Sequence, residues 1–416
     1  MNILLLQGPL GPFYKILSQH LSLAGHYVIK VNFNGGDECW SCVGDKINYY
    51  DTPEEWDAFF RQILKKNAID LVICYGDCRY YHRVAHHICA KKNIPFWVFE
   101  EGYLRPDFVT LEPGGVNAFS QWYEQRERLP YLMWSNEFKA PMTVGKTFAM
   151  RAWYASYYHI NKALKHYRYP YFVNHRPWSL WQETMGWIKG AYVKYRHLRT
   201  DKSLLEFLKK HHAGHIFLVP LQVSEDFQIR EHSDFDSIEQ MIENIVSSFA
   251  KHASEEDVLL FKHHPMDRGY VSYHKCIERL ISVYCLDNRI FYGFEIPLPK
   301  LYPFLKGVVT INSTVGFSAL LHHVPTICLG RALYDISRLT TKGSLSSFWQ
   351  KQDPVCTLTF NRVRNSLLHL TQLNASFYQH LNWSARAAIV KMQLIEPMAN
   401  EIDRKSNLSV LKMGRE

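Results

Sequence analysis

Short apolar runs recur through the first hundred residues, and each is followed by a turn-forming or polar cluster. Apolar positions at helical spacing fill the stretches between these runs, and Thr52 with Glu54 and Glu55 marks the start of one helix. Strand, turn and helix repeated in this order predict a parallel sheet with helices on both faces. The expected strands are 3–7, 27–33, 71–75 and 94–99, and the expected helices are 13–24, 52–66 and 79–92.

The same alternation resumes near residue 203. Expected strands here are 216–220, 258–261, 308–311 and 325–328, with helices over 238–253 and 316–323 and a long helical pattern over 373–395. We therefore predict an α/β fold of GT-B-like architecture, in which two Rossmann-like domains face a cleft. The expected parts are an N-terminal domain 1–144, an aromatic and basic helical insertion 145–202, a C-terminal domain 203–371, and a terminal helix with a polar tail 372–416.

The insertion differs from both blocks in composition. Trp and Tyr alternate with Lys and Arg from residue 145 to residue 200, and Glu183 is the sole acidic residue there. Rings and cations without acids suit a surface that lies against anionic lipid headgroups. A helical hairpin with core aromatics explains the pattern as well, whereas nucleic-acid binding is the weaker alternative and is not expected.

Composition narrows the class of protein. The chain has 416 residues and a formal charge of +9 with 21 His, so it has the length for two or three domains and a surface that attracts anions. Residues 1–7 lack the features of a signal peptide, no run is long enough to span a membrane, and the nine Cys form no framework. We expect a cytoplasmic protein in which Cys39 and Cys42 are incidental.

The first chemical motif follows the strand 94–99. Glu100 and Glu101 come directly after it, and Gly102 and Arg105 follow. A carboxylate at the carboxyl end of a parallel strand points toward the crevice where ligands bind. Because neighbouring strand residues face opposite sides, one of the two carboxylates is expected to enter the cleft.

Two further motifs end strands of the second block. A histidine at a strand end can donate to a leaving phosphate or act as an acid, and hydroxyls at a helix start can bind an anion or cap the helix. Gln222 lies in a polar loop after a third strand. The predicted donor-binding residues are Lys262, His263, His264, Pro265, Asn312, Ser313, Thr314 and Gly316.

Glycines in two early loops allow close approach of a ligand to the backbone. These are Gly8 and Gly11 in one loop, and Gly35 and Gly36 in the other. Neither loop has a Walker A or a complete G-x-G-x-x-G pattern, and the chain has no H-E-x-x-H motif or acidic metal cage. No metal or other cofactor is therefore expected.

With these motifs assembled, the chain resembles the capsule polysaccharide synthesis family and its KpsS-like (LipB-like) members. The residues that carry the resemblance are Gln7-Gly8-Pro9, Phe33-Asn34-Gly35-Gly36-Asp37, Tyr75-Gly76-Asp77, Glu100-Glu101-Gly102-Tyr103-Leu104-Arg105-Pro106, Thr110-Leu111-Glu112, Lys262-His263-His264-Pro265 and Asn312-Ser313-Thr314-Val315-Gly316. The resemblance implies a β-Kdo transferase that uses CMP-Kdo and places the first Kdo on phosphatidylglycerol. That product begins the poly-Kdo linker of a Gram-negative capsule, so it implies a peripheral location on the inner face of the inner membrane and other capsule proteins as partners.

The acidic and His-Pro motifs are also similar to those of bacterial sialyltransferases. That likeness implies that Glu101 is the catalytic carboxylate, that His264 contacts the CMP phosphate, and that Ser313 and Thr314 hold it. A β-linked product from a β-configured donor implies retention, which needs a nucleophile and a second acid/base group. The reserve candidates are Asp77, Asp37, Glu112, Glu225 and Asp226.

Two other functions remain open from the sequence. The chain could transfer another nucleotide-activated acidic sugar, as sialyltransferases do. It could also be a non-catalytic capsule assembly or export factor whose Rossmann-like halves bind glycan or partner proteins.

Overall fold

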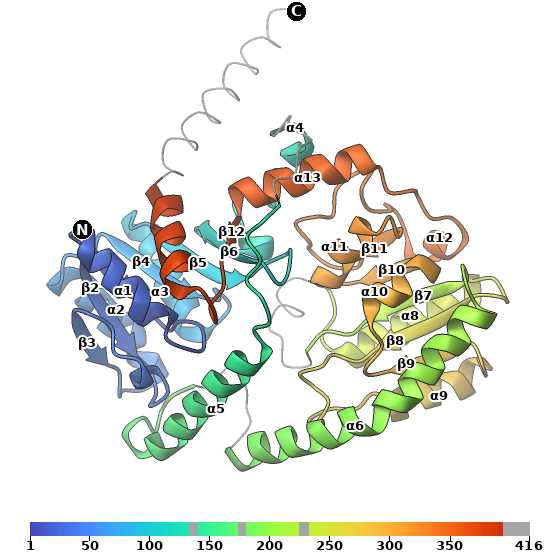
Figure 1. Cartoon of the computed structure of the whole chain (residues 1–416), viewed down its shortest axis with the longest axis horizontal. Helices are drawn as coiled ribbons and strands as arrows, with labels where there is room; N and C mark the ends of the chain where they lie inside the picture. Colours follow the sequence, from blue (N-terminus) through green and yellow to red (C-terminus); the bar gives the residue numbers. More distant parts are fainter. Residues whose placement is uncertain (133–139, 174–179, 224–232, 394–416) are drawn as a thin grey trace, which may run out of the picture. The chain divides into compact units, whose positions relative to one another are not determined.

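A computed structural model describes residues 1–132, 140–173, 180–223 and 233–393. The chain divides into two compact units, each built from separated stretches (Figure 1). Unit 1 contains Met1–Val116, Lys139–Val173 and His369–Glu416, and unit 2 contains Asn117–Phe138 and Asn174–Leu368. The predicted fold of two Rossmann-like α/β units is confirmed.

Unit 1 is built on a seven-stranded sheet in the order β12-β6-β5-β4-β1-β2-β3. The five strands from β3 to β5 in this order pair in parallel, and β6 and β12 add antiparallel pairs at one side. The strands are β1 Asn2–Leu5, β2 Tyr27–Asn32, β3 Asp45–Asn48, β4 Leu71–Tyr75, β5 Phe96–Glu101, β6 Phe108–Pro113 and β12 Gln372–Asn374. The main helices are α1 Phe13–Leu23, α2 Trp56–Lys66, α3 Tyr80–Lys92 and α5 Phe148–Leu164.

The alternation of side chains along β5 gives each face of this sheet its own core. Trp97 and Phe99 pack with α1 and with residues 373–392, whereas Phe96 and Val98 pack with α2 and α3. Successive strand residues point to opposite faces, so an apolar run such as 96–99 is covered by helices on both sides. The strand consequently delivers Glu100 and Glu101 to different faces at its carboxyl end.

Unit 2 is built on a five-stranded, fully parallel sheet in the order β11-β10-β7-β8-β9. The strands are β7 Ile216–Pro220, β8 Val258–Lys262, β9 Ile290–Gly293, β10 Leu305–Thr310 and β11 Thr326–Cys328. The main helices are α6 Leu180–His211, α8 Ile238–His252, α9 His274–Tyr284, α11 Thr314–Leu321, α12 Leu345–Gln350 and α13 Thr357–Leu370.

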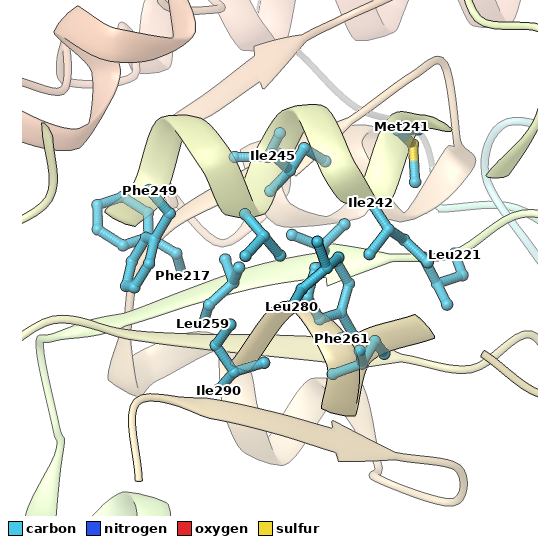
Figure 2. Packing of buried hydrophobic residues seen from close by; sticks show 14 of the residues in the cluster. Phe217, Leu221, Met241, Ile242, Ile245, Phe249, Leu259, Phe261, Leu280 and Ile290 are labelled. Atoms are coloured by element: carbon cyan, nitrogen blue, oxygen red, sulfur yellow. The ribbon is translucent and has the colours of Figure 1, made fainter. Parts of the chain in front are cut away.

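Helix α8 covers one face of this sheet. Figure 2 shows Ile242, Ile245 and Phe249 of α8 above Phe217 and Leu259 of the neighbouring strands β7 and β8. Ser237 begins the helix, and its side chain accepts a hydrogen bond from the Gln240 N–H. This core fixes the strands whose carboxyl ends carry the predicted donor-binding residues.

Two expected boundaries differ from the structure. The insertion 145–202 is not one hairpin, because α5 belongs to unit 1 and α6, which continues to His211, belongs to unit 2. The helix expected over 373–395 is helical only from residue 381, since Gln372–Asn374 forms β12 and pairs with β6. The spacing of apolar residues indicates whether a segment is a helix or a strand, but it does not indicate the unit on which that segment packs. The sequence therefore could not show that α5 and α6 belong to different units or that β12 joins the sheet of unit 1.

The helices of the structure can also be compared with the requirements of a membrane-spanning helix. Throughout the described ranges, every helix falls short of the combined length and apolarity that a bilayer crossing requires.

Truncation of the α8 core should destabilise unit 2. Ile245 is fully buried, so Ile245→Ala should lower the free energy of unfolding by about 2–4 kcal/mol through lost apolar contact and a residual cavity. Urea unfolding followed by circular dichroism measures this change. The exposed neighbour Asn244 supplies the matched control, and Asn244→Ala should change the same quantity by less than about 0.5 kcal/mol. Equal effects of the two variants would contradict the packing of α8 on the sheet.

Candidate active site

Glu101 lies at the carboxyl end of β5 and is held by two side chains from distant parts of the chain. Arg151 of α5 places Nη1 3.7 Å from Glu101 Oε1. The Tyr378 hydroxyl donates to the same oxygen over 3.3 Å, and the Arg151 guanidinium also lies over the Tyr378 ring. The side chain of Glu101 remains 19% exposed, so this oriented carboxylate can be reached from solvent.

Glu100 faces the other side of the sheet. Its Oε1 accepts a hydrogen bond from the Glu101 N–H over 2.9 Å. Burial raises the pKa of Glu100 to about 7, the charges of Glu101 and Asp77 add to this, and the hydrogen bond and Arg79 oppose it. A carboxyl group whose pKa lies near neutral pH is suited to an acid/base role.

A buried hydrogen-bond network lies at the ends of β1 and β2, on the same edge of the parallel sheet. Asp37 accepts hydrogen bonds from Gln7 Nε2 over 3.1 Å, from the Tyr158 hydroxyl over 3.0 Å and from the Phe33 N–H over 3.0 Å. Arg79, after β4, donates to Gln7 Oε1 over 2.6 Å. The protein itself occupies the acceptor positions of Asp37, so this reserve candidate has a structural role.

The predicted glycine loops approach protein side chains. A Cβ on Gly36 would lie 2.7 Å from the Tyr158 ring, and one on Gly35 would lie 2.4 Å from Lys165 Cβ. Helix α5 thus docks directly on the 33–37 loop. Gly8 makes room for Tyr14 in the same way, and Gly11 makes room for Tyr154. These glycines are explained by packing, which the sequence alone did not distinguish from ligand approach.

Asp77 and Arg105 have structural partners. Asp77 is buried, which raises its pKa, and its Oδ2 accepts from the Val116 N–H over 2.8 Å. Arg105 is exposed, and its Nε donates to the Gly102 carbonyl over 3.1 Å within the β5–β6 turn. Both residues hold loops near the carboxylates in place.

Glu112 lies in the interior of unit 1 and is fully buried. Burial lowers the pKa of Lys391 to about 7, and the charge of Glu112 acts in the opposite direction. Lys391 Nζ also donates to the Gln372 carbonyl over 2.6 Å. Glu112 therefore helps to anchor the C-terminal helical stretch on the sheet. The remaining reserve candidates, Glu225 and Asp226, lie outside the described residues.

In unit 2 the fold brings three predicted motifs to one edge. Strands β10, β7 and β8 are neighbours and parallel, so the residues that follow them meet at the carboxyl edge of the sheet. Gln222, after β7, donates from Nε2 to Asn312 Oδ1, after β10, over 2.8 Å. This is the position at which α/β sheets bind ligands.

The two adjacent histidines have different environments. His263 is buried, which lowers its pKa to about 4, and its Nδ1 lies 2.6 Å from the Tyr292 hydroxyl. His264 is only partly buried, and its Nδ1 accepts from the Met266 N–H over 3.2 Å. The neutral His264 ring consequently carries its proton on Nε2, where it can donate to a phosphate oxygen. His263 positions the turn, and His264 is the better ligand contact.

Lys262 lies at the end of β8, near side chains of both charges. Burial lowers its pKa, Arg268 adds to this effect, and Glu295 and Asp201 oppose it. Glu295 is itself paired with Arg268 at 2.5 Å. Pro265, two residues after His263, is exposed in the turn. Lys262 thus supplies a partly buried cation beside His264.

The third motif starts helix α11. Ser313 caps it by accepting the Val315 N–H over 3.2 Å, and the next residue, Thr314, is the first of the helix. A Cβ on Gly316 would lie 2.5 Å from the Tyr334 hydroxyl, so this glycine serves packing. The ordinary cap is therefore present, and the first turn of the helix still directs its N–H groups to the same edge.

At this edge, several buried polar atoms have no partner within the part of the chain that the structure describes. Gln222 Oε1, Asn312 Nδ2 and His263 Nε2 have no hydrogen-bond partner among the residues that the structure describes. Burying such atoms without a partner costs free energy, and each needs a reason. Their clustering after three adjacent strands indicates a site for a polar ligand.

Among the described side chains, no group of three or more His, Cys, Asp or Glu is arranged to hold a metal ion.

The functional residues that the sequence analysis missed come from far along the chain. Arg151, Tyr158 and Tyr378 contact the unit 1 site, and Tyr292 contacts His263. Arg151 and Tyr158 lay within the aromatic and basic insertion, where the pattern indicated a surface. Nothing in the sequence around Tyr378 signals its contact with Glu101.

The chain is similar in sequence to capsule polysaccharide proteins of two bacteria. The E. coli protein described as "Capsule polysaccharide export protein KpsS" is 37% identical over 381 residues, which is 90% of this chain and 96% of that protein. The Neisseria meningitidis serogroup B protein described as "Capsule polysaccharide modification protein LipB" is 36% identical over 387 residues, which is 91% of this chain and 92% of that protein.

A solved structure of Thermosulfurimonas dismutans KpsC, described as a beta Kdo 2,7 transferase, is 14% identical. The match covers 95% of this chain and 100% of that one, with a TM-score of 0.45. At the level of sequence families, residues 70–378 match the family described as "Capsule polysaccharide biosynthesis protein". The chain therefore belongs to the capsule polysaccharide biosynthesis protein family.

Proposed function

We propose that this chain is a glycosyltransferase that moves Kdo from CMP-Kdo to a phosphatidylglycerol-type lipid. The product would start the poly-Kdo linker of a Gram-negative capsular polysaccharide. The protein would act in the cytoplasm, peripherally on the inner face of the inner membrane, together with other capsule proteins. No metal is part of this proposal.

The observation that carries the proposal is the carboxylate pair at the end of β5. Glu101 is accessible and oriented by Arg151 and Tyr378, while the pKa of its neighbour Glu100 is about 7. Two carboxyl groups with different environments are typical of sites where one stays charged and the other exchanges protons. Membership of a capsule biosynthesis family supports a glycan as the substrate class.

In the proposed reaction the configuration of the sugar is retained. Glu101 attacks the anomeric carbon of Kdo, and the bond to the CMP phosphate breaks. The acceptor hydroxyl then displaces Glu101 from the opposite side, and its proton passes to Glu100. His264 and Lys262, with the first turn of α11, neutralise the departing phosphate.

One observation favours a second function. The E. coli relative is named as an export protein, which is compatible with a non-catalytic capsule assembly or export factor. Transfer of a different nucleotide-activated acidic sugar is the alternative within the enzyme class. The following variants separate these functions.

Removal of the Glu101 charge should abolish transfer and leave the fold intact. Glu101→Gln should lower kcat by about 10²–10⁴-fold, because the amide cannot act as nucleophile or base. Purified protein is incubated with CMP-Kdo and a fluorescent phosphatidylglycerol, and mass spectrometry detects one added Kdo. Glu124→Gln, at an exposed position, is the control and should retain activity. Full activity of Glu101→Gln would remove the assignment, and no product with the unaltered protein would favour the export factor.

Glu100 should make stability depend on pH. Because its pKa is about 7, above the ordinary 4.5, the folded protein keeps a proton that the unfolded chain releases. This group therefore lowers the free energy of unfolding as pH rises from about 5 to 8, by at most about 3 kcal/mol. Glu100→Gln removes that contribution, and urea unfolding at both pH values measures the difference.

The same residue should also shape the pH dependence of transfer. Because Glu100 must be deprotonated to accept the acceptor's proton, the acidic limb of the wild-type profile should have an apparent pKa near that of Glu100, and Glu100→Gln should lose activity at every pH. A variant with normal turnover would leave Glu100 a purely structural role.

The two histidines should separate into binding and structural effects. His264→Asn should raise the KM for the donor about tenfold or more without changing the thermal midpoint, because a phosphate contact is lost. His263→Asn should lower the thermal midpoint, since the buried ring contacts Tyr292 and Phe294. Differential scanning fluorimetry and steady-state kinetics measure both variants, and the reverse pattern would exchange the roles.

A further inference from the structure

Helix α5 exposes its apolar side. Its outward residues follow one another at spacings of three and four positions, which places them on a single face. Trp153 is 64% exposed and Leu164 is 69% exposed. We call this set the α5 stripe, and it consists of Met150, Trp153, Tyr157, Ile160 and Leu164.

The opposite face of α5 is polar and is fixed on unit 1. Arg151 contacts Glu101, and Tyr158 contacts Asp37. Lys165, just after the helix, pairs with Glu38 at 2.6 Å. Gly35 and Gly36 have no side chains, so α5 lies close against the 33–37 loop. Rotation of α5 to bury its apolar side would break these contacts. The exposure of the α5 stripe therefore follows from the requirements of the site.

Helix α6 of unit 2 also has an exposed apolar face and a closely packed inward face. Its outward residues repeat at spacings of four and three, and Trp181 is 72% and Tyr195 is 77% exposed. Its inward face packs closely, since a Cβ on Gly186 would lie 2.3 Å from the Tyr270 ring. Tyr270 lies in the segment that follows His264. The α6 stripe consists of Trp181, Met185, Ile188, Tyr192 and Tyr195.

The charges around both stripes are mostly positive. Residues 140–173 include no Asp or Glu, and Glu183 is the one acidic residue of 180–200, whereas Lys and Arg recur in both ranges. A second copy of the chain on either stripe would bring like charges together. An anionic lipid surface instead offers opposite charge to the cations and an apolar interior to the rings, and Trp and Tyr favour this boundary.

We propose that the α5 stripe and the α6 stripe are the surfaces with which this protein binds an anionic phospholipid bilayer. Their aliphatic and aromatic side chains enter the boundary between headgroups and acyl chains, and the flanking Lys and Arg contact lipid phosphates. This inference deepens the proposed function, on whose lipid acceptor it rests, by naming the surfaces that hold the protein where that acceptor lies.

Vesicle flotation of the full-length protein tests the proposal. The vesicles contain phosphatidylcholine with about one third phosphatidylglycerol, and no sugar donor is present. Trp153→Ser combined with Leu164→Ser should weaken partitioning at least about tenfold, because two inserting side chains are lost. Leu23→Ser with Val283→Ser is the matched control, since both residues are exposed and lie on neither stripe. It should bind like the unaltered protein.

A parallel pair of variants tests the α6 stripe. Trp181→Ser with Ile188→Ser should weaken partitioning by a similar factor. The conservative pair Trp153→Phe with Leu164→Met should restore binding, which separates apolar insertion from an effect on folding. Binding of the unaltered protein should also fall at high salt and on pure phosphatidylcholine.

Three results would overturn the proposal. Undiminished flotation of both serine pairs would exclude the stripes as the lipid surface. Equal loss in the matched control would show a non-specific effect. Conversion of a dimer to a monomer in the serine pairs, seen by light scattering with flotation unchanged, would identify a second copy as the occupant. Because flotation needs no donor, a failed transfer assay with intact binding would contradict only the proposed enzyme activity.

Discussion

Buried polar atoms at the carboxyl ends of parallel strands need hydrogen-bond partners, and this requirement organises both units. In unit 1 the network around Asp37 meets this requirement from within, whereas Asn32 Oδ1 at the end of β2 has no hydrogen-bond partner among the described residues. Asp37 is surrounded by donors from Gln7, Asn34 and Tyr158, and Tyr158 can reach it because Gly36 leaves room for its ring. The helix that brings Tyr158 also brings Arg151 to Glu101. One solvation requirement thus fixes the helix, and the helix fixes the carboxylate.

Unit 2 meets the same requirement incompletely. Gln222 and Asn312, which follow the neighbouring strands β7 and β10, form a hydrogen bond with each other, but each keeps a buried polar atom without a partner among the described residues. His263 is similar, since Tyr292 satisfies one ring nitrogen only. Protein donors fill the acceptor positions of Asp37, whereas Gln222, Asn312 and His263 each keep a polar atom without a partner among the described residues, as expected of a binding site.

Much of this organisation could be predicted from the sequence. The apolar runs located most of the parallel strands, and strand ends located Glu100, Glu101, His264 and Asn312, because parallel strands present their carboxyl ends at one edge. The roles of Gly35, Gly36 and Gly316 could not be predicted, since a glycine looks the same whether a ligand or a side chain fills the space in front of it. Tyr378 was missed because its contact with Glu101 spans 277 positions and leaves no local pattern.

The edge strand β12 lies late in the chain but completes the sheet of unit 1, so that sheet can form fully only after β12 has been synthesised. Residues 372–374 complete the sheet of unit 1, and Tyr378 and Lys391 then contact Glu101 and the Gln372 carbonyl. A ribosome makes all of unit 2 before it reaches these residues. A nascent chain therefore holds Glu101 on an unfinished sheet until residues 372–378 have been made, and a polypeptide that ends before them has Arg151 but lacks Tyr378, the second side chain that orients this carboxylate.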